Sequence, residues 1–508
     1  MATQDIVQKL WNLCNILRDD GITYHQYVTE LTYILFLKMI EETGESEEFR
    51  NQIELKYEEK LKKLAIDKKK DVKELSEDEK NSVKSAVDIY SWEYFISLDG
   101  LELKKYYADL LKDLGSAGIP KISNIYTKAV SNIDEPKNLK KLISEISKLD
   151  WFEAKEEGLG DMYEGLLQKN ADEKKSGAGQ YFTPRVLIDV MTELIDPKIF
   201  ERCFDPACGT CGFVISAYNH AVPDKDKRFE LDDFEMKELE DCYYGVELVT
   251  DAHRLALMNT YLHGVPAKIY REDSLKPDAK RFKDFDVIMT NPPFGTKKGG
   301  EIISRDDISY QTSNKQLNFL QVIYRSLKAD GKARCAVVLP DNVLFADGDG
   351  TSVRQELMNF CDLNMILRLP TGIFYAQGVK TNVLFFTRGK TEEGNTKKVW
   401  FYDLRTNMPK FGKTTPLKKE HFKDFITAYK AENREEIKDE RLSSFTRDEI
   451  TNKGDSLDWG LIRDDSIIDY EDLPDPADSA EEAVSKLEEA VDLLNSVIKE
   501  LRSLEGKN

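Results

Sequence analysis

The chain has 508 residues, of which 41% are hydrophobic and 33% are charged, and its formal net charge is -20. This length predicts roughly two to four globular domains, and no apolar run reaches the ~18 residues that a membrane-spanning helix needs. The acidic balance argues against unaided binding to nucleic acid, which normally requires a basic surface. Either the substrate is not a nucleic acid, or a partner carries most of the contact.

Cysteine usage and the N-terminus indicate a reducing compartment. The seven cysteines are an odd number in a long chain and do not form a disulfide framework. Residues 1–5 lack a basic segment followed by an apolar core, so the sequence gives no sign of a secretory signal. We therefore expect a cytoplasmic protein.

Residues 1–155 are predicted to form a helical N-terminal domain. Apolar residues recur at helical spacing in two segments, first at Ile6, Leu10, Leu13, Cys14 and Leu17, and then at Val28, Leu31, Leu35 and Met39. Gly21 is predicted to end the first helical segment. The high charge density of 41–81 predicts a solvated helical excursion or a partly mobile loop.

From 156 to 412 the pattern is typical of an α/β domain with a mostly parallel, Rossmann-like sheet, because short apolar runs alternate with longer helical stretches. Strands are expected at 202–204, 242–246, 267–270, 286–290, 334–339, 365–369 and 383–387, with a further strand at 399–402. These strands fit one doubly wound domain.

Two further regions complete the chain. Residues 413–476 are charged and match no clear element. Within 477–508 a heptad seam follows a capping box made by Ser479 and Glu482, and the seam comprises Val484, Leu487, Val491, Leu494, Ile498 and Leu501. It predicts either a coiled-coil-like helix that assembles with another subunit, or an amphipathic helix packed on its own domain.

Polar side chains follow four successive predicted strands, whose carboxyl ends should meet at one edge of the sheet. They are Asp205 with the turn Gly209-Thr210-Cys211-Gly212, then Glu247, Asp273 and Asn291. The glycine turn alone is weak evidence for a ligand site. However, Glu247 can accept ribose hydroxyls and Asp273 can accept an adenine amino group, so the four strand ends together predict a nucleoside cofactor.

The loop Asn291-Pro292-Pro293-Phe294 suits the positioning of a planar group that carries an amine. The Asn291 side-chain oxygen and the Pro292 carbonyl are acceptors, and the two prolines fix φ and so aim them in advance. Phe294 offers a flat face for stacking. An ordinary strand-ending turn is the alternative for this loop alone, since Asn-Pro and Pro-Pro are common loop dipeptides.

Two smaller motifs have functional and structural interpretations. Cys208 and Cys211 invite a redox or metal interpretation, but no second Cys/His pair stands at zinc spacing, so no metal is expected and all five histidines are interpreted as structural or surface groups. In 177–185, Thr183 is expected to cap a helix with Pro184 in its first turn. The preceding aromatic pair, Tyr181 and Phe182, predicts a lid over a small-molecule pocket, while a well-capped helix start is the alternative.

The order of these motifs carries a resemblance. With Gly-Gln-Tyr-Phe-Thr-Pro-Arg at 179–185, then Asp-Pro-x-x-Gly-x-x-Gly-Phe, Glu247, Asp273 and Asn-Pro-Pro-Phe, the chain resembles S-adenosylmethionine-dependent N6-adenine DNA methyltransferases of the gamma arrangement. The helical N-terminal region, the segment Leu-Gly-Asp-Met-Tyr-Glu at 159–164 and the heptad tail resemble the modification (M) subunit of type I restriction-modification systems.

This resemblance implies a site and partners. The implied cofactor-binding residues are Gln180, Tyr181, Phe182, Thr183, Pro184, Arg185, Asp205, Gly209, Thr210, Cys211, Gly212, Glu247 and Asp273, and the implied catalytic residues are Asn291, Pro292, Pro293 and Phe294. The implied partners are DNA, a specificity (S) subunit shared by two M subunits, and a restriction and translocation (R) subunit. RNA or protein-glutamine methylation, or a catalytically silent scaffold, stay open as alternatives.

One position departs from the pattern of the family. Relatives more often carry glycine or alanine where this chain has Cys211. A cysteine is small enough for cofactor binding to survive, and it can add sensitivity to thiol reagents.

Overall fold

The structure is a computed structural model, and it describes residues 2–19, 21–22, 24–43, 46–119, 122–149, 151, 158–173, 183–222, 231–295, 305–370, 372–374, 380–406, 408–409, 411 and 415–459. The described residues belong to one compact unit, Met1–Trp459. The predicted heptad helix at 477–508 lies outside the described residues. Among the described helices, none combines the length and the apolar character that crossing a membrane requires.

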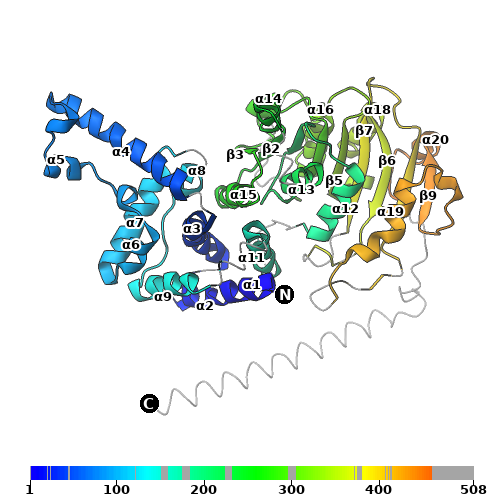
Figure 1. Cartoon of the computed structure of the whole chain (residues 1–508). Coiled ribbons are helices and arrows are strands. Elements are labelled where there is room, and N and C mark those ends of the chain that lie inside the picture. The colour runs from blue at the N-terminus through cyan, green and yellow to red at the C-terminus, as the bar shows by residue number, and fades with distance from the viewer. Residues whose placement is uncertain are drawn as a thin grey trace, which may run out of the picture. The chain divides into compact units, whose positions relative to one another are not determined.

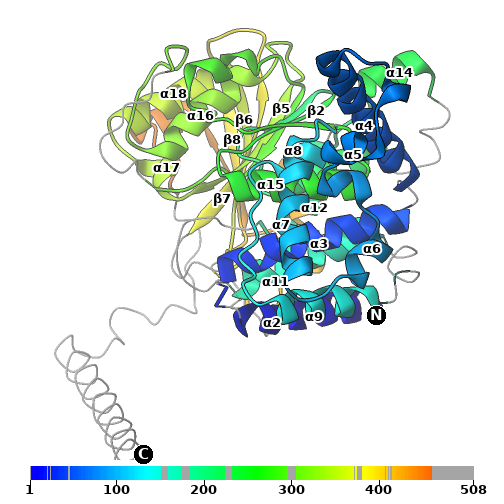
Figure 2. The ribbon, with the colours of Figure 1, turned by 90° about the vertical axis from the view of Figure 1, so that its left-hand side faces the viewer.

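The N-terminal region is helical, as the sequence predicts (Figure 1). Its helices are α1 (Ala2–Asn12), α2 (Cys14–Asp19), α3 (Tyr24–Thr43), α4 (Ser46–Lys68), α5 (Glu77–Ser82), α6 (Trp92–Ser97), α7 (Gly100–Ser116), α8 (Ile122–Tyr126), α9 (Pro136–Ser147) and α11 (Leu159–Glu173). α9 packs against both α3 and α7 (Figure 2). They share a core in which Leu35, Leu110 and Leu142 are fully buried. The charged segment 41–81 is largely the helix α4, which buries only a few apolar side chains and exposes its lysines and glutamates.

A nine-stranded sheet forms the second part of the described chain, in the order β3-β2-β1-β4-β5-β7-β6-β8-β9. The strands are β1 (Cys203–Asp205), β2 (Tyr243–Val246), β3 (Ala267–Tyr270), β4 (Val287–Thr290), β5 (Arg334–Pro340), β6 (Cys361–Arg368), β7 (Thr381–Arg388), β8 (Lys398–Asp403) and β9 (Leu442–Thr446). The pairings show that β7 and β9 run against the other strands. The predicted mostly parallel sheet is therefore confirmed, and it continues through β9 into the region 413–476.

Helices cover the two faces of this sheet (Figure 1). On one face α12 (Arg185–Ile195), α13 (Gly212–Ala221) and α19 (Lys423–Lys430) share a core with the strands, in which Leu187, Ile215 and Phe425 are fully buried. α16 (Lys315–Ser326) and α18 (Asp349–Phe360) lie on the other face. The remaining helices of this part are α14 (Asp233–Leu239), α15 (Thr250–Leu262), α17 (Asn342–Phe345) and α20 (Arg447–Asn452).

α15 joins the helical region to the sheet. The Arg254 guanidinium donates from Nε to the Ile125 carbonyl at 2.7 Å and from Nη2 to the Thr127 carbonyl at 3.1 Å. Met258, also on α15, belongs to the core that contains Met162 and Tyr163 of α11. Because α15 directly follows β2, it connects this core to the strand edge at which the candidate site lies.

Candidate functional site

The four predicted strand ends do meet at one edge of the sheet. β1, β2, β3 and β4 are neighbours and run parallel, so their carboxyl ends point the same way. In this register Asp205 lies opposite Gly245 and Val246 lies opposite Tyr270. The residues that follow these strands are therefore brought to one edge, as expected for the ligand edge of an open α/β sheet.

The glycine turn after β1 presents backbone to this edge. Gly209 has φ 54°, a left-handed conformation that glycine adopts without strain, and Cys211 has φ 66°, which is uncommon for a residue with a side chain. Cys211 is also the residue before α13, and it makes no side-chain cap to that helix. The first N–H groups of α13 are thus donors directed at the strand edge, which favours a ligand with negative or polar groups.

Glu247 holds the turn from the neighbouring strand. Its Oε2 accepts a hydrogen bond from the Gly209 N–H at 3.0 Å, and its Oε1 accepts one from the Val249 N–H at 2.7 Å. Burial raises the pKa of this carboxyl, and the backbone hydrogen bonds oppose that shift. Each carboxylate oxygen has a second acceptor site. Glu247 can therefore accept two hydroxyl groups of a ligand while it holds the turn.

Asp205 lies beneath the turn rather than open to the edge. It is 1% exposed, and its Oδ1 accepts a hydrogen bond from the Ala207 N–H at 3.0 Å. Burial raises its pKa to about 7, and the hydrogen bonds to the carboxyl only partly offset this. Asp205 thus shapes the turn from below.

Asp273, after β3, is partly buried and orders its own turn. Its Oδ1 accepts a hydrogen bond from the Leu275 N–H at 2.9 Å. The neighbouring Ser274 hydroxyl donates to the Pro206 carbonyl, and Arg305 donates from Nη1 to the Ser274 carbonyl at 2.8 Å. The Ser274 contact ties the end of β3 to Pro206, between β1 and the glycine turn.

Three positioning residues of this edge were absent from the sequence prediction. Besides Ser274 and Arg305, Asn259 on α15 donates from Nδ2 to the Thr210 carbonyl at 2.9 Å. Asn259 is fully buried. A polar residue on an otherwise apolar helical face was the one feature of the sequence that could have identified it as a positioning residue. Ser274 and Arg305 had no such signal, because their partners lie far away in the sequence.

Asn291 carries the feature most directly related to chemistry. Its Nδ2 donates to the Thr183 hydroxyl at 3.0 Å, which fixes the orientation of the amide. Its Oδ1 is buried and accepts no hydrogen bond within the described part of the chain. An acceptor that is buried without a partner is costly, and a contact with a ligand is one explanation for such a group. Asn291 Oδ1 is therefore an oriented acceptor that can bind a donor group of a ligand.

This contact corrects the prediction for Thr183. The residue before α12 is Pro184, whose carbonyl accepts from the N–H groups of Leu187 and Ile188, and no side chain caps the helix there. Thr183 instead binds Asn291 across the edge. A tertiary hydrogen bond has replaced the local cap that the sequence pattern favours.

The rest of the Asn-Pro-Pro-Phe loop is anchored at its far end. Pro292 is buried, Pro293 is exposed and Phe294 packs partly buried against the sheet core. Gly295 has φ 115°, and its carbonyl accepts from the Lys315 N–H at the start of α16 at 3.2 Å. The loop is therefore held by Thr183 at one end and by α16 at the other.

Arg185 fixes the start of α12 next to Thr183. Its Nη1 donates to Glu164 of α11 at 2.7 Å and 2.8 Å, and its Nε lies 3.0 Å from Asp189. Burial acts against the charge of Arg185, but the two carboxylates outweigh it and raise its pKa. The other predicted residues of this segment, Gln180, Tyr181 and Phe182, lie outside the described residues.

Burial shields the two cysteines at the glycine turn. Cys208 and Cys211 are buried and unlinked, and burial raises the pKa of both thiols. Attack by a cysteine requires the thiolate. Because Cys211 is fully buried, we now expect little of the thiol sensitivity that its sequence position suggested.

Comparison with known proteins places this arrangement in a family. Residues 154–465 match the family model described as N-6 DNA Methylase, and residues 6–146 match the HsdM N-terminal domain. The chain belongs to the N-6 DNA methylase family. The predicted enzyme class, an adenine-specific DNA methyltransferase, is that of this family.

Whole-length relatives narrow the assignment of this methylase. It is 39% identical to the type I restriction enzyme StySPI methylase subunit of Salmonella potsdam, over 99% of this chain and 96% of that protein. It is also 39% identical to the EcoKI methylase subunit of Escherichia coli K12, with the same coverage. The resemblance to type I M subunits is thereby confirmed.

Solved structures agree with this assignment. A crystal structure of the EcoKI M protein matches with a TM-score of 0.52 and 34% identity, over 98% of this methylase and 96% of that chain. A chain from a structural study of the assembly and conformational transition of the type I R-M system matches with a TM-score of 0.70 and 26% identity, over 99% of each chain. The match to the EcoKI M protein covers both the helical region and the sheet.

Proposed function

We propose that this methylase is the methylation subunit of a type I restriction-modification complex. It transfers a methyl group from S-adenosylmethionine to N6 of an adenine that is flipped out of a DNA site chosen by a separate specificity subunit. The observation that carries the proposal is the buried Asn291 Oδ1, which has no partner in the described chain and stands at the same strand edge as the glycine turn and Glu247.

The residues of the edge fit the proposed cofactor. The Glu247 carboxylate retains acceptor sites for the ribose hydroxyls, and Asp273 lies at the next strand end for the adenine amino group. The turn Gly209-Thr210-Cys211-Gly212 supplies backbone donors, with Asp205 beneath it. When bound, the cofactor supplies an electrophilic methyl group on sulfonium sulfur. The segment 180–185 completes the proposed site.

The chain's own part in the chemistry is orientation of the target amine. The N6 lone pair of adenine is delocalised into the ring, which makes the amine a poor nucleophile. Acceptance of its two hydrogens by Asn291 Oδ1 and the Pro292 carbonyl favours a more tetrahedral nitrogen with a freer lone pair. Such positioning can lower the activation free energy of methyl transfer by about 7 kcal/mol or more. Proton loss follows the attack, so no strong base is needed beforehand.

Phe294 stacks on the flipped base, and Pro293 stiffens the loop that carries Phe294. Extrusion of a base from the duplex costs a few kcal/mol, and stacking on an aromatic side chain offsets part of that cost. Phe294 supplies the stacking face, and Pro293 keeps the loop rigid between its two anchors.

Charge supports the proposed assembly. A chain of net charge -20 is poorly suited to grip DNA alone, so an S subunit, shared by two M subunits, would carry most of the contact. The heptad tail at 477–508 is the proposed attachment, and an R subunit would supply cleavage and translocation. We further propose the division 1–155, 156–412, 413–476 and 477–508, in which the third region adds β9 to the sheet of the second, and a cytoplasmic location.

A substrate panel tests this function. The purified chain is titrated calorimetrically with S-adenosylmethionine, with and without a co-expressed S subunit. Methyl transfer from labelled cofactor is then measured on duplex DNA, RNA and a glutamine-containing peptide. We expect cofactor binding in both states and transfer to the adenine of duplex DNA when the S subunit is present. Transfer to RNA or peptide alone, or no cofactor binding in either state, would overturn the proposal.

A further inference from the structure

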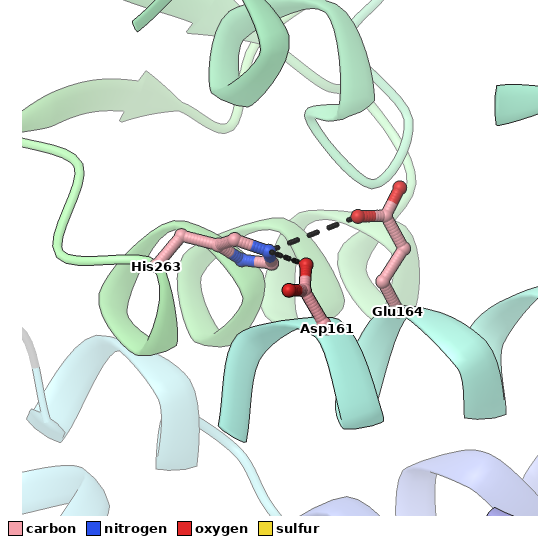
Figure 3. A group of neighbouring side chains, drawn as sticks. All are labelled: Asp161, Glu164 and His263. Carbon is pink, nitrogen blue, oxygen red and sulfur yellow. Dashed lines mark ion pairs between the residues drawn. The ribbon is translucent and has the colours of Figure 1, made fainter. Parts of the chain in front are cut away.

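Three ligand-type side chains meet where α11 passes α15 (Figure 3). Asp161 and Glu164 lie one turn apart on α11, and His263 directly follows α15. His263 Nε2 lies 3.6 Å from Asp161 Oδ1 and 3.7 Å from Glu164 Oε2. The three ligand atoms all lie within 4.8 Å of one another. Sequence spacing gave no hint of this group, because its two helices are far apart along the chain.

The imidazole is oriented so that Nε2 faces the carboxylates. Its Nδ1 lies 2.8 Å from the Asn259 carbonyl, which can only accept, so Nδ1 carries a proton. The side chain is 7% exposed, and Nε2 has no hydrogen-bond partner among the described residues. The ring is seated against the bare backbone of Gly160, where a Cβ would stand 2.8 Å from it. The Nε2 atom of a buried imidazole thus points at two carboxylates.

The spacing is too long for hydrogen bonds and suits a shared ion. N–H···O bonds extend to about 3.2 Å, below both observed separations. Zinc binds imidazole nitrogen and carboxylate oxygen at about 2.0–2.2 Å, so two ligands at the tetrahedral angle stand about 3.4 Å apart. A metal-binding histidine commonly donates its other N–H to a carbonyl, as His263 does to Asn259. Both separations from His263 Nε2 lie within a few tenths of an ångström of this value, and the three ligand atoms, which lie within 4.8 Å of one another, would draw together around the ion.

The local charge calls for a cation. Arg185 is bonded to Glu164 and lies beside Asp189, and Asp161 adds a further carboxylate nearby. Arg185 therefore faces three carboxylates, of which Asp189 is also close to Lys419. Asp161 and Glu164 thus leave negative charge beside His263 that a divalent cation would offset. Asp161 is 70% exposed at its side chain, so the remaining coordination positions are open to water.

We propose that Asp161, Glu164 and His263 bind a divalent transition-metal ion of the zinc class, which clamps α11 to α15. The imidazole favours such a metal over magnesium or calcium, which prefer oxygen ligands alone. The role is structural. Glu164 also holds Arg185 at the start of α12, and α15 also holds the glycine turn through Asn259. The ion would fix α11 relative to α15. α11 holds the start of α12 next to Thr183, and α15 holds the Thr210 carbonyl.

Metal titration of the tag-free, metal-stripped full chain tests the site. Zn²⁺ binding is measured by calorimetry, Co²⁺ binding by the visible absorption of the tetrahedral ion, and the melting temperature with and without Zn²⁺. Asp161→Asn and His263→Gln are compared with Asp251→Asn and His253→Gln, which make the same changes on α15 outside the group. We expect one ion in the wild type and in both controls, and at least about tenfold weaker binding in both site variants.

Several results would overturn the proposal. The wild type could bind no Zn²⁺ or Co²⁺, or Asp161→Asn could bind both as tightly as the wild type. The second result is decisive even if His263→Gln folds poorly, because the Asp161 side chain is exposed. A third result would be a melting temperature that changes with pH and with His263→Gln but not with Zn²⁺. It would show that the imidazole acts as a protonated ion-pair partner, and it would also exclude the metal site.

Discussion

Replacement of Thr183 by valine isolates the contact that orients Asn291. Valine has the shape of threonine but no hydroxyl, so the 3.0 Å hydrogen bond from Asn291 Nδ2 is lost with little change in packing. Thr183 is 9% exposed, so water does not readily replace the lost acceptor. A buried hydrogen bond contributes about 1 kcal/mol, and a catalytic group misplaced by about 1 Å can cost about 100-fold in rate. We expect methyl transfer to slow by about 10- to 100-fold.

The assay separates orientation from binding. Single-turnover methyl transfer to duplex DNA gives the rate, and calorimetry gives the dissociation constant for S-adenosylmethionine. The rate should fall more than the affinity, and Thr183→Ser, which keeps the hydroxyl, should restore most of the rate. Thr451→Val, on the exposed end of α20, is the control. Wild-type rates in Thr183→Val, or failure of Thr183→Ser to recover, would refute the proposed orientation.

Three further predictions concern the turn and the tail. Asp205 has a pKa of about 7 instead of its usual 3.8, so the folded chain keeps a proton that the unfolded chain releases, and the associated stability is lost as pH rises through this window. Asp205→Asn stays neutral, so its free energy of unfolding relative to wild type should rise by up to about 4 kcal/mol between acid pH and pH 8. The same difference in melting temperature between variant and wild type at pH 5 and at pH 8 would count against this. Because the Cys211 thiol is buried with a raised pKa, iodoacetamide should leave cofactor binding of the native chain intact. Loss of binding after iodoacetamide in the wild type but not in Cys211→Ala would contradict this prediction. Deletion of 478–508 should abolish co-elution with the S subunit in size-exclusion chromatography but preserve cofactor binding, whereas an intact complex would exclude the tail as the attachment.

The strands that carry the site were predictable because each combines a short apolar run with a polar residue at its end. β4 is a clear case, with a fully buried body followed by Asn291. β9 was not predicted, because Leu-Ser-Ser-Phe-Thr has little apolar character and is a strand through its pairing with β8. The reversed direction of β7 likewise depends on its neighbours β5 and β6, and an apolar run does not encode it.

Tertiary partners explain the rest of the differences at the site. The identities of Glu247 and Asn291 followed from the strand pattern, but the contact between Asn291 and Thr183 joins segments that no local rule connects. The same holds for Asn259, whose amide reaches the Thr210 carbonyl from α15. Residues that touch the ligand edge directly could thus be inferred from the sequence, whereas residues that position them required the structure.

The role of Asn291 is the central claim, and Asn291→Ala tests it most directly. The variant is assembled with the S subunit, its affinity for S-adenosylmethionine is measured by calorimetry, and its methyl transfer to duplex DNA is measured with Asn452→Ala as the control. We predict unchanged cofactor affinity and a rate at least about 100-fold lower, because the oriented acceptor is removed while the turn and Glu247 are intact. Normal methylation by Asn291→Ala would contradict the account.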